Sequence, residues 1–114
     1  MKLYSLLQVF VGDANEQQLI QPLLPSEPFH VILRYEEERY NLHISQYGLS
    51  VFKEEPATYT LHIKTERDLH SLFTGEIPLQ TLLRRQGIVY EGSLRILLLL
   101  ESVFFICHNS TNCT

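Results

Sequence analysis

The sequence predicts an α+β fold in which helices cover one face of a β-sheet. Residues 29–35 and 39–45 alternate apolar and polar side chains with a period of two, which is typical of strands with one buried face. Residues 65–104, by contrast, contain two amphipathic helical segments, a short strand and an almost wholly apolar helix. Because only one side of the predicted sheet is apolar, we expect all the helices to lie on that side.

The first 24 residues read as helical. Apolar side chains at helical spacing predict an amphipathic helix over residues 2–11 that ends at Gly12, and they favour this over a signal peptide: Leu3, Leu6, Leu7, Phe10 and Val11. Asp13 and Glu16 form an acidic version of the capping box, which predicts a second short helix through Leu19 and Ile20. Pro22 should interrupt that helix, and residues 25–28 form a linker.

The strands follow the linker. Residues 29–35 and 39–45 should pair as a hairpin across a solvated turn at residues 36–38. A third strand is expected over residues 49–53. After a break at residues 54–57, a fourth should run over residues 58–64.

The second half of the chain carries clear helix boundaries. Thr65 is a predicted N-cap with Asp68 as its partner, and Gly75 supplies a left-handed end. Pro78 should lie in the first turn of a helix that runs to about Arg85. Residues 88–91 alternate as a short strand closed by Gly92, and Ser93 is a plausible N-cap for the last helix, to residue 104.

The last helix has more apolar surface than one core contact can cover. Six residues form its broad core-facing side: Ile96, Leu97, Leu99, Leu100, Val103 and Phe104. Leu94, Leu98 and Phe105 fall on the other side. We therefore expect a sheet to cover one side of this helix, and another helix, a partner chain or a bound lipid to cover the other.

Composition and charge exclude several classes of protein. The 114 residues suit a single domain, 1–114, and the formal charge of −4 gives no basic surface for nucleic acid. No apolar stretch is long enough to span a membrane. Cys107 and Cys113 lie in a polar C-terminal tail, where reduced thiols in the cytoplasm are expected and a small disulfide is the alternative. The glycosylation acceptor patterns at Asn109 and Asn112 matter only in a secretory compartment.

The sequence has little catalytic chemistry. His30, His43 and His62 occupy outward strand positions and would converge on a metal only if their strands were neighbours in register. A solvated polar face that includes histidines explains them better. No nucleophile elbow, phosphate loop or dinucleotide fingerprint occurs, so we expect no enzyme, no catalytic residue, no metal and no cofactor.

Residues 58–100 contain a series of short motifs in a fixed order: a Thr-rich strand, Asp68-Leu69 with Leu72, the helix end Phe73-Thr74-Gly75, Pro78 and Gln80, the pair Leu82-Leu83, and Ile88-Val-Tyr90-Glu-Gly92 before an apolar helix. In their order and spacing these motifs resemble the sterol carrier protein 2 domain family. Gln86 stands where the family commonly has Gly, and Ser93 stands where Asn or Asp commonly follows the glycine. The family's peroxisomal ending is not present at the C-terminus of this sequence.

The resemblance implies a five-stranded mixed, mostly antiparallel sheet with helices covering one face and a hydrophobic tunnel between sheet and helices. It implies that the tunnel takes fatty acids, sterols or other lipids. The tunnel walls would then be Leu69, Leu72, Phe73, Leu82, Leu83, Tyr90, Leu94, Leu97 and Leu98.

The sequence thus leads to two hypotheses. The first is non-catalytic binding of a hydrophobic small molecule in the tunnel. The alternative is a structural or regulatory module that forms a homodimer or binds a protein partner through Leu94, Leu98 and Phe105.

Overall fold

The structure is a computed structural model that describes residues 2–53 and 59–112, with side chains as far as residue 107. Its helices and strands follow in this order: α1 (Lys2–Glu16), the 3-10 helix η1 (Gln18–Leu23), β1 (Phe29–Tyr35), β2 (Glu38–Ser45), β3 (Gly48–Phe52), β4 (Tyr59–Ile63), α2 (Glu66–Thr74), α3 (Leu79–Arg84), β5 (Ile88–Glu91) and α4 (Leu94–Asn112). The strand break predicted at residues 54–57 lies outside the described residues.

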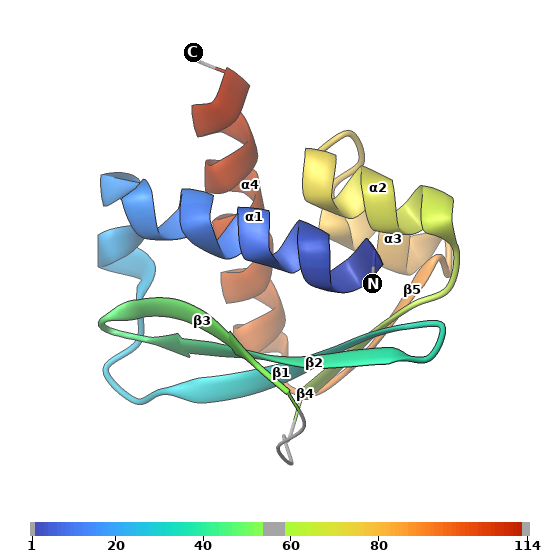
Figure 1. Cartoon of the computed structure of the whole chain (residues 1–114), viewed down its shortest axis with the longest axis horizontal. Coiled ribbons are helices and arrows are strands. Elements are labelled where there is room, and N and C mark those ends of the chain that lie inside the picture. The colour runs from blue at the N-terminus through green and yellow to red at the C-terminus, as the bar shows by residue number, and fades with distance from the viewer. Residues whose placement is uncertain (1, 54–58, 113–114) are drawn as a thin grey trace.

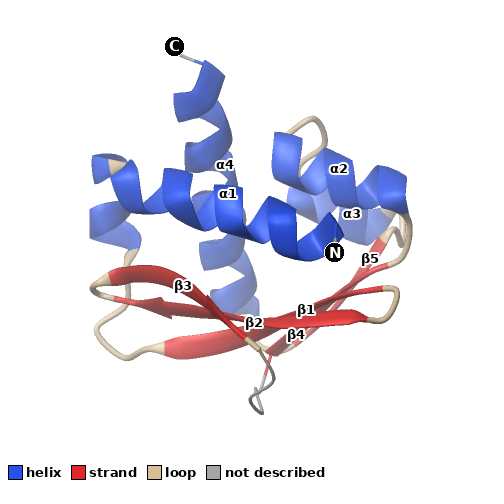
Figure 2. Cartoon of the chain, in the orientation of Figure 1, coloured by secondary structure: helices blue, strands red, loops and turns tan. Residues whose placement is uncertain are grey.

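The strands form one mixed sheet. Its order is β3-β2-β1-β4-β5, with β1 and β4 parallel and the other neighbours antiparallel. All described helices lie on the same side of this sheet, which Figure 1 and Figure 2 show. The predicted α+β class, the five strands and the one-sided cover of helices are therefore confirmed.

The inner face of the sheet forms the floor of the core. Its central side chains have no exposed surface: Val31, Leu33, Leu42, Ile44, Leu61 and Ile63. Leu3 and Leu7 of α1, Leu69 of α2 and Leu82 of α3 pack over this floor and are equally buried. Burial of this apolar surface is the main force that holds helices to sheet.

Helix α1 is longer than predicted, because Gly12 does not end it. Ala14 is buried and continues the apolar side of the helix beyond Gly12, so packing outweighs the low helix propensity of glycine. Asp13 therefore lies inside α1 and caps no second helix. The segment that follows is the 3-10 helix η1, which contains Pro22.

Glu38 caps the start of α1, so its prediction as a residue of the solvated turn is wrong. Its carboxylate accepts hydrogen bonds from the backbone N–H groups of Leu3 at 3.1 Å and Tyr4 at 3.5 Å. Burial raises the pKa of Glu38 and these amide hydrogen bonds lower it; the net pKa lies below its ordinary value. The bond joins the first helix to strand β2.

The boundaries of α2 match the prediction. Thr65 is the N-cap, and its hydroxyl accepts a hydrogen bond from Asp68 N at 3.1 Å. Gly75 ends the helix in the left-handed region at φ 75°.

Glu101 of α4 caps the next helix, α3. Pro78 is the N-cap of α3 rather than a residue of its first turn, and its side chain makes no capping hydrogen bond. The Glu101 carboxylate accepts from Gln80 N at 3.2 Å and from Gln80 Nε2 at 2.7 Å. This contact caps α3 and fixes it against α4.

Helix α4 begins as predicted and ends later. The Ser93 hydroxyl accepts from Ile96 N at 3.3 Å, which confirms Ser93 as the N-cap. The helix continues past Phe104 to Asn112, so the prediction that Cys107 lies in a polar tail is wrong. Cys107 is buried in α4, while Cys113 lies outside the described residues.

The first prediction concerns Gln86, which occupies the left-handed region at φ 63°. A non-glycine residue in this region costs about 1–2 kcal/mol of backbone strain. Glycine removes the strain but loses more backbone entropy on folding, so the net gain in stability is smaller. We expect Gln86→Gly to raise the free energy of unfolding by about 1 kcal/mol in urea denaturation. Gln86→Ala keeps the strained backbone and should not stabilise the protein. An equal gain in both variants would contradict this explanation.

The second prediction concerns the Glu101 cap. We expect Glu101→Ala to lower the free energy of unfolding by about 1 kcal/mol, because it leaves the Gln80 amide without its acceptor. Glu101→Gln retains a side-chain oxygen and should lose less. Urea denaturation of the two variants checks this, and identical stabilities for wild type and Glu101→Ala would refute the cap.

Candidate functional site

The outward side of α4 exposes three large apolar side chains. Leu94 is 67% exposed, Leu98 43% and Phe105 66%. Helix α4 packs mainly against η1, α1, α2 and α3. Helix α4 thus has one buried apolar side and one exposed apolar side, as expected. Other helices, rather than the sheet, make most of the contacts with the buried side.

The buried side of α4 ends in a cluster of aromatic rings. Phe104 stacks on Phe10 of α1 with ring centroids 4.5 Å apart, and meets Phe73 of α2 edge-on at 5.5 Å. Phe10 and Phe73 lie 5.7 Å apart. These three rings join α1, α2 and α4 and fill the space where the helices meet.

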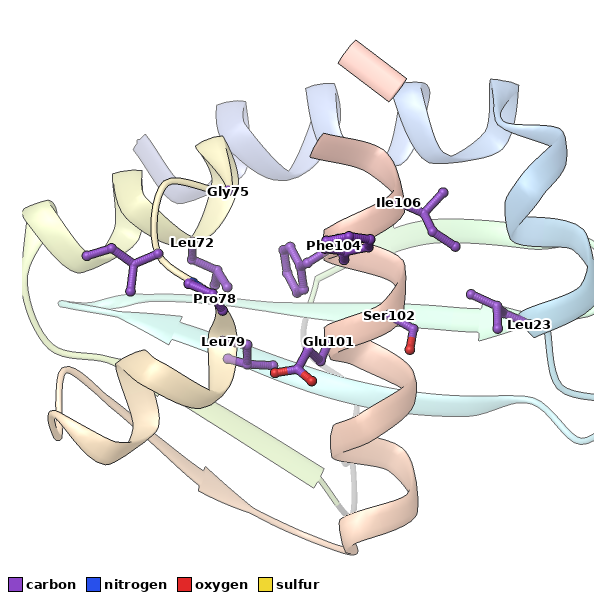
Figure 3. Close-up of a pocket in the computed structure, with 11 residues that line it drawn as sticks. Leu23, Leu72, Gly75, Pro78, Leu79, Glu101, Ser102, Phe104 and Ile106 are labelled. Atoms are coloured by element: carbon purple, nitrogen blue, oxygen red, sulfur yellow. The ribbon is translucent and has the colours of Figure 1, made fainter. Parts of the chain in front are cut away.

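A groove of about 620 Å³ crosses α4 beside this cluster. In Figure 3, Glu101 and Phe104 point towards Pro78 and Leu79, while Ser102 and Ile106 lie on the side of Leu23. The lining is largely apolar: Leu23, Leu72, Gly75, Ile77, Pro78, Leu79, Glu101, Ser102, Phe104, Phe105 and Ile106. Its volume is in the range of small-molecule sites, which are mostly apolar with a few polar groups.

Two local structures build the wall opposite α4. The left-handed turn at Gly75 and the extended backbone of Pro78 lead the chain from α2 into α3. The Glu101 cap then holds α3 at its distance from α4. The carboxylate that faces the groove is therefore already engaged by Gln80.

A second groove, of about 1080 Å³, lies nearer the start of α4. It is lined by Leu23, Leu24, Pro25, Ser26, Glu27, Pro28, Phe29, Tyr59, Leu94, Arg95, Ile96, Leu98, Leu99 and Ser102. Leu23 and Ser102 line both grooves, so the two adjoin across the outward side of α4. The three exposed side chains of α4 line them: Phe105 the first groove, and Leu94 and Leu98 the second.

The structure divides the residues predicted to form tunnel walls. Leu72 lines the first groove, and Leu94 and Leu98 line the second. The others line neither groove: Leu69 and Leu82 are fully buried in the core, and Phe73, Leu83, Tyr90 and Leu97 are half-buried against it. Their role as tunnel walls stays a prediction.

Sequence reasoning did not assign Ile77, Leu79, Glu101 or Ile106 to a site. These residues lie close together only because α3 packs against α4, and no local sequence pattern predicts that packing. The one available signal was the surplus apolar face of the last helix, which includes Phe105.

The three outward histidines do not converge. His30 and His43 are opposite each other in β1 and β2, and their rings stack with centroids 4.4 Å apart. His62 is opposite Arg34, four residues along β1 from His30. Among the described residues, no group of three or more His, Cys, Asp or Glu side chains is arranged to hold a metal ion.

Cys107 is not a reactive thiol. Burial, with a smaller contribution from the charge of Asp13, raises its pKa to about 12. The thiol therefore stays protonated near neutral pH, and thiolates rather than thiols are nucleophiles.

No helix in the described part of the chain combines the length and apolar character needed to cross a membrane.

No family model matches the sequence, and no curated protein matches it either.

Solved structures do share the fold. The ubiquinone synthesis protein UbiJ-SCP2 superposes with a TM-score of 0.68 at 12% identity, covering 90% of this chain and 87% of that chain. A crystal structure of sterol carrier protein 2 gives 0.67 at 11% identity, with 91% and 94% covered. Palmitated SCP2L2 from Aedes aegypti gives 0.60 at 9% identity, with 87% and 90% covered. The chain therefore has the SCP2-like fold.

Proposed function

We propose that residues 1–114 form one SCP2-like domain that binds a hydrophobic small molecule without catalysing a reaction. The observation that carries this proposal is the apolar groove of about 620 Å³ between α4 and the α2–α3 connection. A fatty acid, a sterol or another lipid is the proposed class of ligand. The neighbour described as palmitated SCP2L2 supports a fatty acyl chain as the first ligand to test.

The proposed mechanism is burial of apolar surface. Each Å² of apolar surface removed from water contributes roughly 25 cal/mol. Leu72, Ile77 and Leu79 on one wall and Phe104, Phe105 on the other supply such surface.

Polar selection should be weak in this groove. Glu101 is engaged by Gln80, and the Ser102 hydroxyl donates to Leu98 O at 3.0 Å. With its few polar groups already bonded, the groove should accept several lipids rather than one. The remaining predicted tunnel residues, Leu69, Phe73, Leu82, Leu83, Tyr90 and Leu97, would border the ligand only if the space extended inwards.

The third prediction tests the groove with three charged variants at exposed helical positions. Phe105→Glu places a charge in the first groove and Leu98→Glu places one in the second, whereas Val9→Glu on α1 is the matched control. We expect a fluorescent fatty acid to bind wild type and Val9→Glu equally. Phe105→Glu should bind it at least tenfold more weakly, because the ligand would have to desolvate a carboxylate.

The Leu98→Glu result locates the ligand further. If Leu98→Glu weakens fatty acid binding to a comparable extent, the ligand extends into the second groove. If binding by Leu98→Glu is unchanged, the ligand occupies the first groove only. No saturable binding to wild type, or equal binding by wild type and Phe105→Glu, would refute the proposal.

A second candidate function is self-association through α4. The exposed side chains of Leu94, Leu98 and Phe105 lie along one side of the helix, so a two-fold contact would pair this stripe with its own copy. The apolar side chains among those that line the two grooves would extend this contact beyond the helix itself. A stable dimer typically buries about 800 Å² per partner, which requires the groove walls as well as the stripe.

The fourth prediction separates the two candidates by analytical ultracentrifugation. If α4 mediates a dimer, wild type and Val9→Glu should sediment as dimers and Leu98→Glu as a monomer, because the dimer would bury the new carboxylate. Monomeric wild type at the highest attainable concentration would exclude this function. A monomer that binds the fatty acid supports the groove alone.

A further inference from the structure

The outer face of the sheet, opposite the helices, carries a row of basic side chains. Arg39 of β2 is directly opposite Arg34 of β1, and Arg34 is directly opposite His62 of β4. All three belong to the outward set of their strands, because their neighbours Tyr40, Leu33 and Leu61 point into the core. Neighbouring strands are about 4.8 Å apart, so the row brings three basic groups close together. We call Arg34, Arg39 and His62 the basic row.

Among the described residues, no carboxylate forms an ion pair with the basic row. The ion pairs among the described residues join Glu66 to Lys2 and to His70, both on the helical side. Glu36 and Glu37 lie in the turn beside the row, and Glu91 is opposite Thr60 on β4, yet none forms an ion pair with it. Two arginines directly opposite each other destabilise a sheet unless an anion offsets their repulsion.

Arg34 also has an unused donor. Its Nε is buried and has no acceptor among the described residues. In proteins, the great majority of buried side-chain donors have a hydrogen-bond partner, so a buried donor without one requires an explanation. An oxyanion on the row would supply the missing negative charge, and it would also be an acceptor for Nε once the Arg34 side chain turned outwards.

Two neighbouring polar side chains on this face, Asn41 and His30, contact each other. Asn41 is only 1% exposed, and its Oδ1 lies 2.9 Å from His30 Nδ1. His30 in turn stacks on His43. Asn41 and His30 are therefore partners of each other, whereas Arg34 Nε has no partner among the described residues.

We propose that the basic row binds a phosphate group. Guanidinium groups bind phosphate through two parallel N–H bonds, and two of them with an imidazole N–H match an anion of more than one negative charge. The row lies across neighbouring strands, so the sheet itself holds the donors in place. No described helix covers this face, as Figure 2 shows, so a free phosphate or the headgroup of a phospholipid could reach it.

The test uses matched charge changes on the two sides of the molecule. Arg39→Gln and Arg34→Gln each remove one charge from the basic row, and Arg84→Gln removes one from exposed α3 on the helical side. Titration with inorganic phosphate is followed by NMR chemical shifts. We expect saturable binding to wild type and to Arg84→Gln, with at least a tenfold weaker Kd in both row variants.

Vesicle sedimentation distinguishes the source of the phosphate. If the phosphate belongs to a lipid headgroup, wild type and Arg84→Gln should sediment with vesicles of phosphatidylcholine and phosphatidic acid. The two row variants, Arg34→Gln and Arg39→Gln, should not. Binding of inorganic phosphate alone assigns the site to a free phosphate.

Saturable binding in neither arm, or an equal loss in Arg84→Gln, would overturn the proposal. Because Arg39 is exposed, Arg39→Gln should leave the fold intact. Thermal denaturation gives a second readout, since phosphate should raise the Tm of wild type but not of Arg39→Gln. Fatty acid binding on the helical side should be unchanged in all three variants, so failure here is separable from failure of the groove.

Discussion

The one-sided apolar face of the sheet is the constraint on which the remaining structure depends. Leu33, Leu42 and Leu61 from three neighbouring strands have no exposed surface, and only helices on that side can keep water from them. Helices α1, α2 and α3 supply most of this cover. Helix α4 packs mainly on other helices and so keeps an apolar side facing outwards, beside both grooves.

This arrangement divides the molecule into two chemically different sides. The helical side has an apolar groove beside Phe104 whose polar side chains, Glu101 and Ser102, are already hydrogen-bonded within the protein, which favours ligands recognised by burial. The outer side of the sheet has the basic row, which has no carboxylate partner among the described residues and therefore favours an anion. The sheet separates the two, so each side can be altered by surface substitutions without rebuilding the other.

The candidate site was predicted less completely than the fold. Surplus apolar surface at Leu94, Leu98 and Phe105 is visible in the sequence, because helical periodicity places these residues away from the core side. The Glu101 cap on α3 could not be predicted, since Glu101 and Gln80 are 21 residues apart and no local pattern links them. The same holds for Glu38 and the start of α1, which are 35 residues apart.

The sequence by itself determined the strands, the one-sided sheet and the caps at Thr65 and Ser93, because these follow from periodicity and from hydrogen bonds between residues close in the chain. Tertiary structure decided that α1 continues through Gly12 and that α4 continues past Phe104, because the buried side chains of Ala14 and Cys107 extend the packed side of each helix. It also decided which residues line the grooves and the basic row, because these positions depend on strand register and helix packing between distant segments.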